Sequence, residues 1–170
     1  MGSEMCIRDS FNVEQVTGAG LVRLRLNTKN GRALLSPYDS GLIGEFPAWN
    51  PQQTAQQTDR CYFVAHSKPD NQGFFNTVVR IDTETGDLKS GDVGTNCHTS
   101  EALFAPRPGT SDTRTGYLLS VVYDAVNHRS EIQVRDAEDP SIEYGAAILD
   151  HHVPFGFHGH FTNETFGLSH

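Results

Sequence analysis

The segment Tyr117-Leu118-Leu119-Ser120-Val121-Val122-Tyr123 decides the fold class of this chain. Its apolar run is nearly continuous, which is typical of a strand that is buried on both faces rather than of a strand with one solvent-exposed face. An Asn127-His128 pair follows as a turn. Residues 130–136, Ser-Glu-Ile-Gln-Val-Arg-Asp, then predict the partner strand of a hairpin.

Two similar units lie upstream of this hairpin. Residues 21–26 alternate apolar and basic side chains before a turn at 29–32, and residues 78–82 alternate before a turn at 84–87. Alternation with period two predicts strands with one buried face, and a dipeptide that ends in glycine after each strand (Asn30-Gly31 and Thr85-Gly86) predicts a hairpin. No segment predicts a helix longer than a turn or two. The fold class expected from the sequence is therefore all-β.

The strand-turn units recur at a constant interval. Gly31 and Gly86 are separated by the same number of residues as Arg80 and Arg135. A repeat of roughly 40–50 residues, lengthened by loop insertions, is typical of a β-propeller blade. A β-sandwich also repeats hairpins, and the pattern alone favours neither. About three blades fit this length, and three blades leave sheet edges open. We therefore expect the sequence to be part of a longer chain.

The first ten residues are expected to be an artefact of sequence assembly and not part of the natural protein. Met5-Cys6-Ile7-Arg8-Asp9-Ser10 back-translates to a DNA sequence that resembles a transposon-end adapter. We therefore expect residues 1–10 to be an assembly artefact and residues 11–170 to be the C-terminal part of a propeller domain. A native but unremarkable N-terminus is the alternative.

Composition excludes several classes of function. The formal charge is −8, and the 13 basic residues are scattered, so a nucleic-acid partner is not expected. No apolar run approaches the ~20 residues of a membrane-spanning helix. The three cysteines, Cys6, Cys61 and Cys97, form no C-x-x-C pair and suit a reducing compartment. We expect a cytoplasmic location, with peripheral membrane association left open.

The candidate chemical residues are histidines and glutamates in apolar surroundings. His158 lies between glycines and aromatic residues, in a setting that suits iron, copper or zinc. On a strand, His158 and His160 would face the same side and could chelate together, or one could be a packed residue. Glu45, before Phe46-Pro47, and Glu101, before Ala102-Leu103-Phe104, lie in apolar surroundings, so each is either a rim residue or a buried carboxylate with a partner. Asp59-Arg60 and Asp112-Thr113-Arg114 predict solvated surface charge.

Three separated segments together resemble one family. They are Glu45-Phe46-Pro47, residues 100–109 (Ser-Glu-Ala-Leu-Phe-Ala-Pro-Arg-Pro-Gly) and residues 154–159 (Pro-Phe-Gly-Phe-His-Gly). In sequence and in order they resemble the last three signature segments of the carotenoid cleavage oxygenases. That family includes apocarotenoid and lignostilbene dioxygenases and the retinal-pigment-epithelium isomerase. Ala102 and His160 depart from the usual residues at their positions.

This resemblance implies a seven-bladed propeller with Fe(II) on its axis, held by four histidines that glutamates orient. His158 matches the last iron ligand, and Glu45 and Glu101 match two of the orienting glutamates. We expect Glu101 to hold His158 and Glu45 to orient a ligand outside this sequence. No other histidine here matches a ligand position.

The expected activity of the full enzyme is cleavage of a conjugated C=C bond of a carotenoid, apocarotenoid or stilbene by O2, giving two carbonyl products. We expect this chain alone to be inactive. A second hypothesis is a family member that isomerises or hydrolyses a retinoid-like ester. A third is a non-enzymatic β-propeller-like binding module or degenerate remnant.

Overall fold

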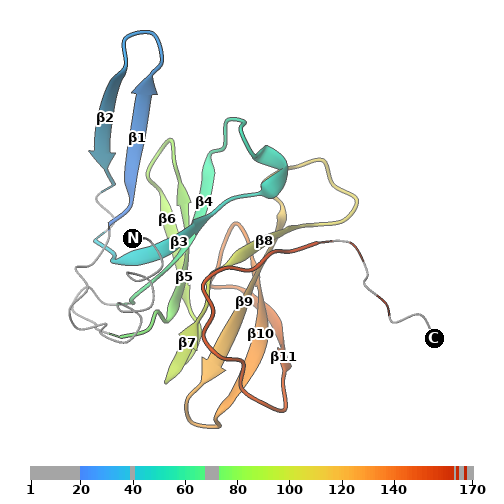
Figure 1. Cartoon of the computed structure of the whole chain (residues 1–170). Coiled ribbons are helices and arrows are strands. Elements are labelled where there is room, and N and C mark those ends of the chain that lie inside the picture. Colours follow the sequence, from blue (N-terminus) through green and yellow to red (C-terminus); the bar gives the residue numbers. More distant parts are fainter. Residues whose placement is uncertain (1–19, 39–40, 68–72, 163, 165–166, 168–170) are drawn as a thin grey trace.

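The structure is a computed structural model that describes residues 20–38, 41–67, 73–162, 164 and 167 (Figure 1). Residues 1–10, predicted to be an artefact, lie outside the described residues. Within those ranges the chain forms strands and a single 3-10 turn, η2 (Pro51–Gln53), which confirms the all-β prediction. No helix in the described ranges has the length and apolarity to cross a lipid bilayer.

The strands of the described ranges form three antiparallel sheets. A hairpin pairs β1 (Val22–Asn27) with β2 (Arg32–Pro37). A four-stranded sheet has the order β3 (Gly44–Ala48), β4 (Arg60–Ala65), β5 (Thr77–Asp82) and β6 (Leu88–Asp92). In the third sheet, β11 (Glu143–Ile148), β10 (Arg129–Asp136) and β9 (Gly116–Asp124) are neighbours, and β9 also pairs with β7 (Cys97–Thr99) and β8 (Leu103–Pro106). The chain therefore runs through two successive meandering sheets.

The three predicted hairpins are confirmed. β9 and β10 pair from Asp124–Arg129 to Tyr117–Asp136, and the intervening turn places His128 at φ 52°. The β5–β6 turn places Gly86 at φ 79°, a conformation that glycine adopts without steric cost. The carboxylate of Asp82 accepts the backbone N–H groups of residues 84 and 85, which fixes this turn.

The main core lies between the two large sheets. Tyr62 on β4 stacks on Phe104 on β8, with ring centroids 5.5 Å apart. Both belong to a buried cluster that joins β4 and β5 to the third sheet: Tyr62, Val64, Val78, Val93, Ala102, Phe104, Leu118, Val122 and Ala137. A second cluster, Phe63, Ala65, Val79 and Ile81, covers the opposite face of the four-stranded sheet. β4 is therefore packed on both faces.

Burial differs from the predicted one-faced pattern in two places. β5 is buried on both faces, because each face carries one of the two clusters. The apolar side of the β1–β2 hairpin is exposed, with Leu24 at 54% and Leu26 at 63%, because no described segment covers it. Figure 1 shows this hairpin projecting beyond the sheets. Alternation identified the strand but not what packs on it.

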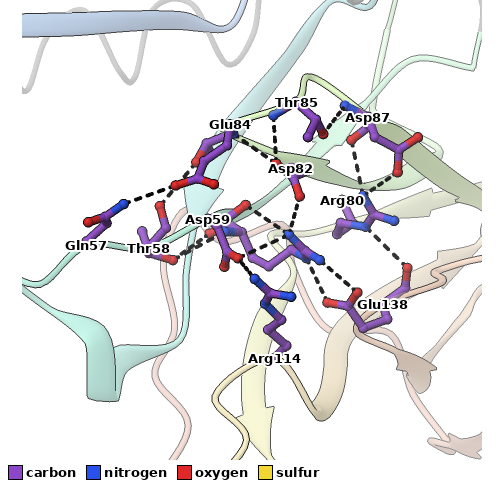
Figure 2. A network of polar contacts seen from close by, with 12 residues as sticks. Gln57, Thr58, Asp59, Arg80, Asp82, Glu84, Thr85, Asp87, Arg114 and Glu138 are labelled. Atoms are coloured by element: carbon purple, nitrogen blue, oxygen red, sulfur yellow. Dashed lines mark hydrogen bonds and ion pairs between the residues drawn. The ribbon is translucent and has the colours of Figure 1, made fainter.

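The prediction of solvated charge at Asp59-Arg60 is wrong. Arg60 is 9% exposed, and its guanidinium pairs with Asp82 at 2.6 Å and with Glu138 at 2.8 and 3.1 Å. Figure 2 shows the carboxylates of Asp82 and Glu138 within this network of polar contacts. Asp59 also accepts from Arg114, whose side chain is half exposed. Because β4 carries Arg60 and the loop after β10 carries Glu138, this cluster ties the two large sheets together.

Candidate functional site

Glu101 lies where the edge strand of the third sheet is interrupted. β7 pairs with one end of β9 and β8 with the other, and residues 100–102 form the break between them. Ser100 bridges the break, because its backbone N–H donates to the Val121 carbonyl (2.8 Å) and its hydroxyl accepts from the Val121 N–H (3.1 Å). Such interruptions redirect a side chain out of the strand pattern. At this interruption the Glu101 side chain is mostly buried, with 13% of its surface exposed.

The Glu101 carboxylate contacts two consecutive residues of the C-terminal segment. Its Oε2 lies 3.3 Å from Nδ1 of His158, and its Oε1 accepts the backbone N–H of Gly159. Residue 159 lies close to this strand, since a Cβ there would stand 3.3 Å from Leu103 Cδ1 and 3.5 Å from Glu101 Oε1. Both carboxylate oxygens are therefore occupied, and the Nε2 atom of His158 faces away from the carboxylate.

Aromatic rings border the His158 imidazole, whose side chain is 76% exposed. The Phe46 ring stands edge-to-face to it, with centroids 5.6 Å apart and planes at 81°. Phe155, three residues before His158, stacks on Phe74 at 4.2 Å. Aromatic neighbours lower the local polarity, as expected around a metal ligand.

Glu45 does not join this group. It lies in β3, the edge strand of the four-stranded sheet, where the pairing with β4 shifts by a bulge between Glu45 and Ala48. Its side chain is exposed and makes no hydrogen bond or ion pair with any described residue. Glu45 and Glu101 therefore occupy similar places, each at an irregularity in the edge strand of its sheet. Only Glu101 meets a histidine.

Among the described residues, His160 makes none of the contacts that His158 makes. The described residues from 152 onward form no strand, so the strand that both alternatives for His158 and His160 assumed, a shared face or one packed histidine, is not formed. The His160 side chain is exposed, and it contacts neither Glu101 nor an aromatic ring among the described residues. Gly156 and Gly159, on either side of the Phe157-His158 pair, favour an irregular backbone over a paired one.

The described residues fit one part of an iron site. A neutral imidazole held at Nδ1 by a carboxylate presents Nε2 as a donor that suits iron. No group of three or more His, Cys, Asp or Glu side chains that could hold a metal ion occurs among the described residues. His158 would hold the metal, and Glu101 would orient the His158 imidazole. The described part of the chain brings no second ligand to His158.

A family model described as retinal pigment epithelial membrane protein matches residues 3–163. The chain belongs to this family. The resemblance inferred from the three sequence segments is therefore confirmed. The match runs through Glu45, Glu101 and His158, while their roles toward a metal remain predictions.

Curated relatives of the chain are carotenoid and apocarotenoid oxygenases by name. The apocarotenoid-15,15'-oxygenase of Synechocystis is 31% identical over 116 residues, which is 68% of this chain and 24% of that protein. The carotenoid 9,10(9',10')-cleavage dioxygenase 1 of Arabidopsis thaliana is 30% identical over 158 residues, 86% of this chain and 29% of that protein. The chain thus spans less than a third of the length of these relatives.

Solved structures of the family identify the architecture. The cobalt-substituted Synechocystis ACO superposes with a TM-score of 0.82 at 25% identity, over 89% of this chain and 32% of that chain. The chain is therefore a partial β-propeller, and the sandwich alternative is wrong. The two large sheets are consecutive blades, and their shared core is the packing of one blade on the next.

Sequence reasoning missed the aromatic residues that connect the core to His158. Phe46 contacts Phe75 edge-to-face at 6.3 Å, and the Phe75 ring lies 4.8 Å from that of His66. His66 is 6% exposed, and burial lowers the pKa of its imidazole. The signal for this contact in the sequence is the phenylalanine beside Glu45 in the Glu45-Phe46-Pro47 motif.

Proposed function

We propose that this chain is part of a non-haem iron(II) dioxygenase that cleaves a conjugated C=C bond of a carotenoid, apocarotenoid or stilbene. O2 is the co-substrate and two carbonyl compounds are the products. The observation that carries the proposal is the contact of one carboxylate, that of Glu101, with both His158 and Gly159. The names of the related apocarotenoid oxygenase and carotenoid cleavage dioxygenase support it.

The role of this chain in the reaction is to present one imidazole in a defined tautomer. A carboxylate only accepts hydrogen bonds, so Glu101 accepts the Gly159 N–H on one oxygen and a proton-bearing Nδ1 of His158 on the other. The lone pair of the neutral ring then lies on Nε2, where a metal would bind. When bound, iron(II) supplies the redox chemistry that activates O2.

The remaining ligands are not among the described residues. His158 is largely exposed in this chain, and a catalytic iron needs a dry, enclosed site. We infer that other histidines and the walls of a substrate tunnel come from the portion of the longer relatives that this chain does not span. On this basis the chain alone neither retains iron nor cleaves a substrate. Glu45 would orient one of those further ligands.

Product analysis tests this proposal. The complete product of the source gene, loaded with Fe(II), is incubated with an apocarotenal or a stilbene under air and without O2. We expect two carbonyl fragments under air, a loss of more than about 100-fold in His158→Ala, and an unchanged rate in His160→Ala. Isomerised or hydrolysed product without O2 would favour the retinoid-like reaction. Full activity of His158→Ala would contradict the ligand assignment.

A further inference from the structure

Phe46 has an unusual backbone conformation. Its φ is 57°, in the left-handed region that bulky side chains rarely adopt. The other described non-glycine residues with positive φ, namely Ala55, Asn96 and His128, lie in turns. Phe46 lies inside strand β3. An unfavourable conformation inside a strand persists only where the surrounding structure enforces it, and such residues gather at functional sites.

The pairing of β3 with β4 explains how the conformation is enforced. Gly44 pairs with Ala65 and is so close to β4 that a Cβ would stand 2.6 Å from the Val64 carbonyl oxygen. Ala48 then pairs with Tyr62, which leaves one extra residue on β3. A bulge of this kind bends the strand and redirects a side chain. In β3 the bulge contains Phe46.

The redirected ring connects the core to His158. Phe46 packs against the buried cluster around Tyr62 and Val64, and against Phe75. On its other side it meets the imidazole of His158 edge-to-face at 5.6 Å. His158 is otherwise mostly exposed, and its only hydrogen bond within the described structure is the one to Glu101. A hydrogen bond at Nδ1 restrains the imidazole in its own plane but leaves rotation about that bond open.

We propose that Phe46 is a positioning residue for His158. Its ring restrains the tilt of the imidazole plane, while Glu101 fixes which nitrogen is free. The inference rests on the proposed function, because His158 matters only as a ligand. The bulge in β3 is then the feature that places an aromatic ring from one blade against the ligand of the next.

NMR of the 170-residue chain with isotope-labelled histidine and phenylalanine tests this directly. We expect NOEs between the ring protons of Phe46 and those of His158, and a rigid imidazole by ring-carbon relaxation. Phe46→Leu keeps an apolar side chain but no ring, so we expect the His158 imidazole to gain mobility. Phe46→Tyr should restore the rigid ring. Phe74→Leu is the matched control, because Phe74 touches His98 and Phe155 but not His158.

Two results would overturn the inference. One is the absence of any Phe46–His158 NOE in the unmodified chain, a result that does not depend on whether a variant folds. The other is an equally rigid imidazole in Phe46→Leu with an otherwise intact amide spectrum. Neither result bears on whether the complete gene product cleaves a double bond. Conversely, a gene product without iron or activity would defeat the proposed function and leave the ring contact measurable.

Discussion

Oε2 of Glu101 lies 3.3 Å from Nδ1 of His158, although the two residues are 57 positions apart in the sequence. The other oxygen of the same carboxylate accepts the Gly159 N–H. Glu101 lies in a break of an edge strand and His158 in an irregular segment. The pair therefore depends on how that segment returns across the third sheet, which brings a candidate ligand to its orienting group.

Glu101→Gln should reverse the tautomer of His158. The amide oxygen must accept the Gly159 N–H, so the amide N–H then donates to Nδ1 and the ring proton moves to Nε2. We expect nitrogen NMR of the chain to show a protonated Nε2 in the variant. In the complete gene product iron affinity should fall about 10–100-fold. Glu84→Gln, which changes an exposed carboxylate in the β5–β6 turn, is the control. An unprotonated Nε2 in Glu101→Gln would contradict this reading.

Arg60→Met should weaken the contact between the two blades. The change leaves Asp82 and Glu138 without their shared cation, and Asp82 is 17% exposed. Because Glu138 is 41% exposed and partly solvated, we expect a loss of about 2–4 kcal/mol in urea unfolding rather than the full cost of a buried pair. Arg114→Met also removes a partner of Asp59, but at an exposed position, and should cost less than about 1 kcal/mol. Equal losses of unfolding free energy in the two variants would show that the burial of Arg60 does not strengthen its ion pairs.

Gly91→Ala should disturb the same contact sterically. A Cβ at residue 91 would stand 2.1 Å from the Pro140 carbonyl oxygen and 2.8 Å from the Ser141 nitrogen, and backbone cannot yield as a flexible side chain can. We expect a loss of about 1–3 kcal/mol in unfolding free energy. Gly20→Ala, with open space around it, should leave the unfolding free energy nearly unchanged. An unchanged unfolding free energy in Gly91→Ala would mean that the β6 edge and the loop at residue 140 are not in contact.

Acid should destabilise the chain through Asp82. Hydrogen bonds from the backbone N–H groups of Thr85 and Glu84, and the charge of Arg60, lower the pKa of this carboxyl from 3.8 to about 2. The folded pKa is below the unfolded one, so the stabilisation is complete above about pH 4 and is lost as pH falls toward 2. Asp82→Asn should flatten the fall of unfolding free energy between pH 4 and 2. An unchanged slope would remove Asp82 as a cause.

The strands could be predicted from the sequence because their signal is local. The apolar run at 117–123 and the glycine turns at Gly31 and Gly86 were enough to place three hairpins. Burial was harder, because it depends on distant partners. Arg60 is buried by Glu138, which follows 78 residues later, and the alternating face of β1 has no described cover.

The site was predicted only in part, for a similar reason. Family resemblance selected Glu101 and His158, and the structure places them in contact. Spacing suggested a shared strand face for His158 and His160, but this segment pairs with no neighbouring strand. Phe46 could not be identified as a neighbour of His158, because its position depends on a bulge that neither propensity nor periodicity encodes.

Iron content tests the central claim most directly. The complete product of the source gene is purified, loaded anaerobically with Fe(II), passed over a desalting column and assayed for bound metal, beside His158→Ala and His160→Ala. We predict close to one iron per unmodified chain, a similar value for His160→Ala, and near-complete loss for His158→Ala. Full iron retention in folded His158→Ala, or no iron in the unmodified protein, would contradict the assignment of this chain to an iron dioxygenase.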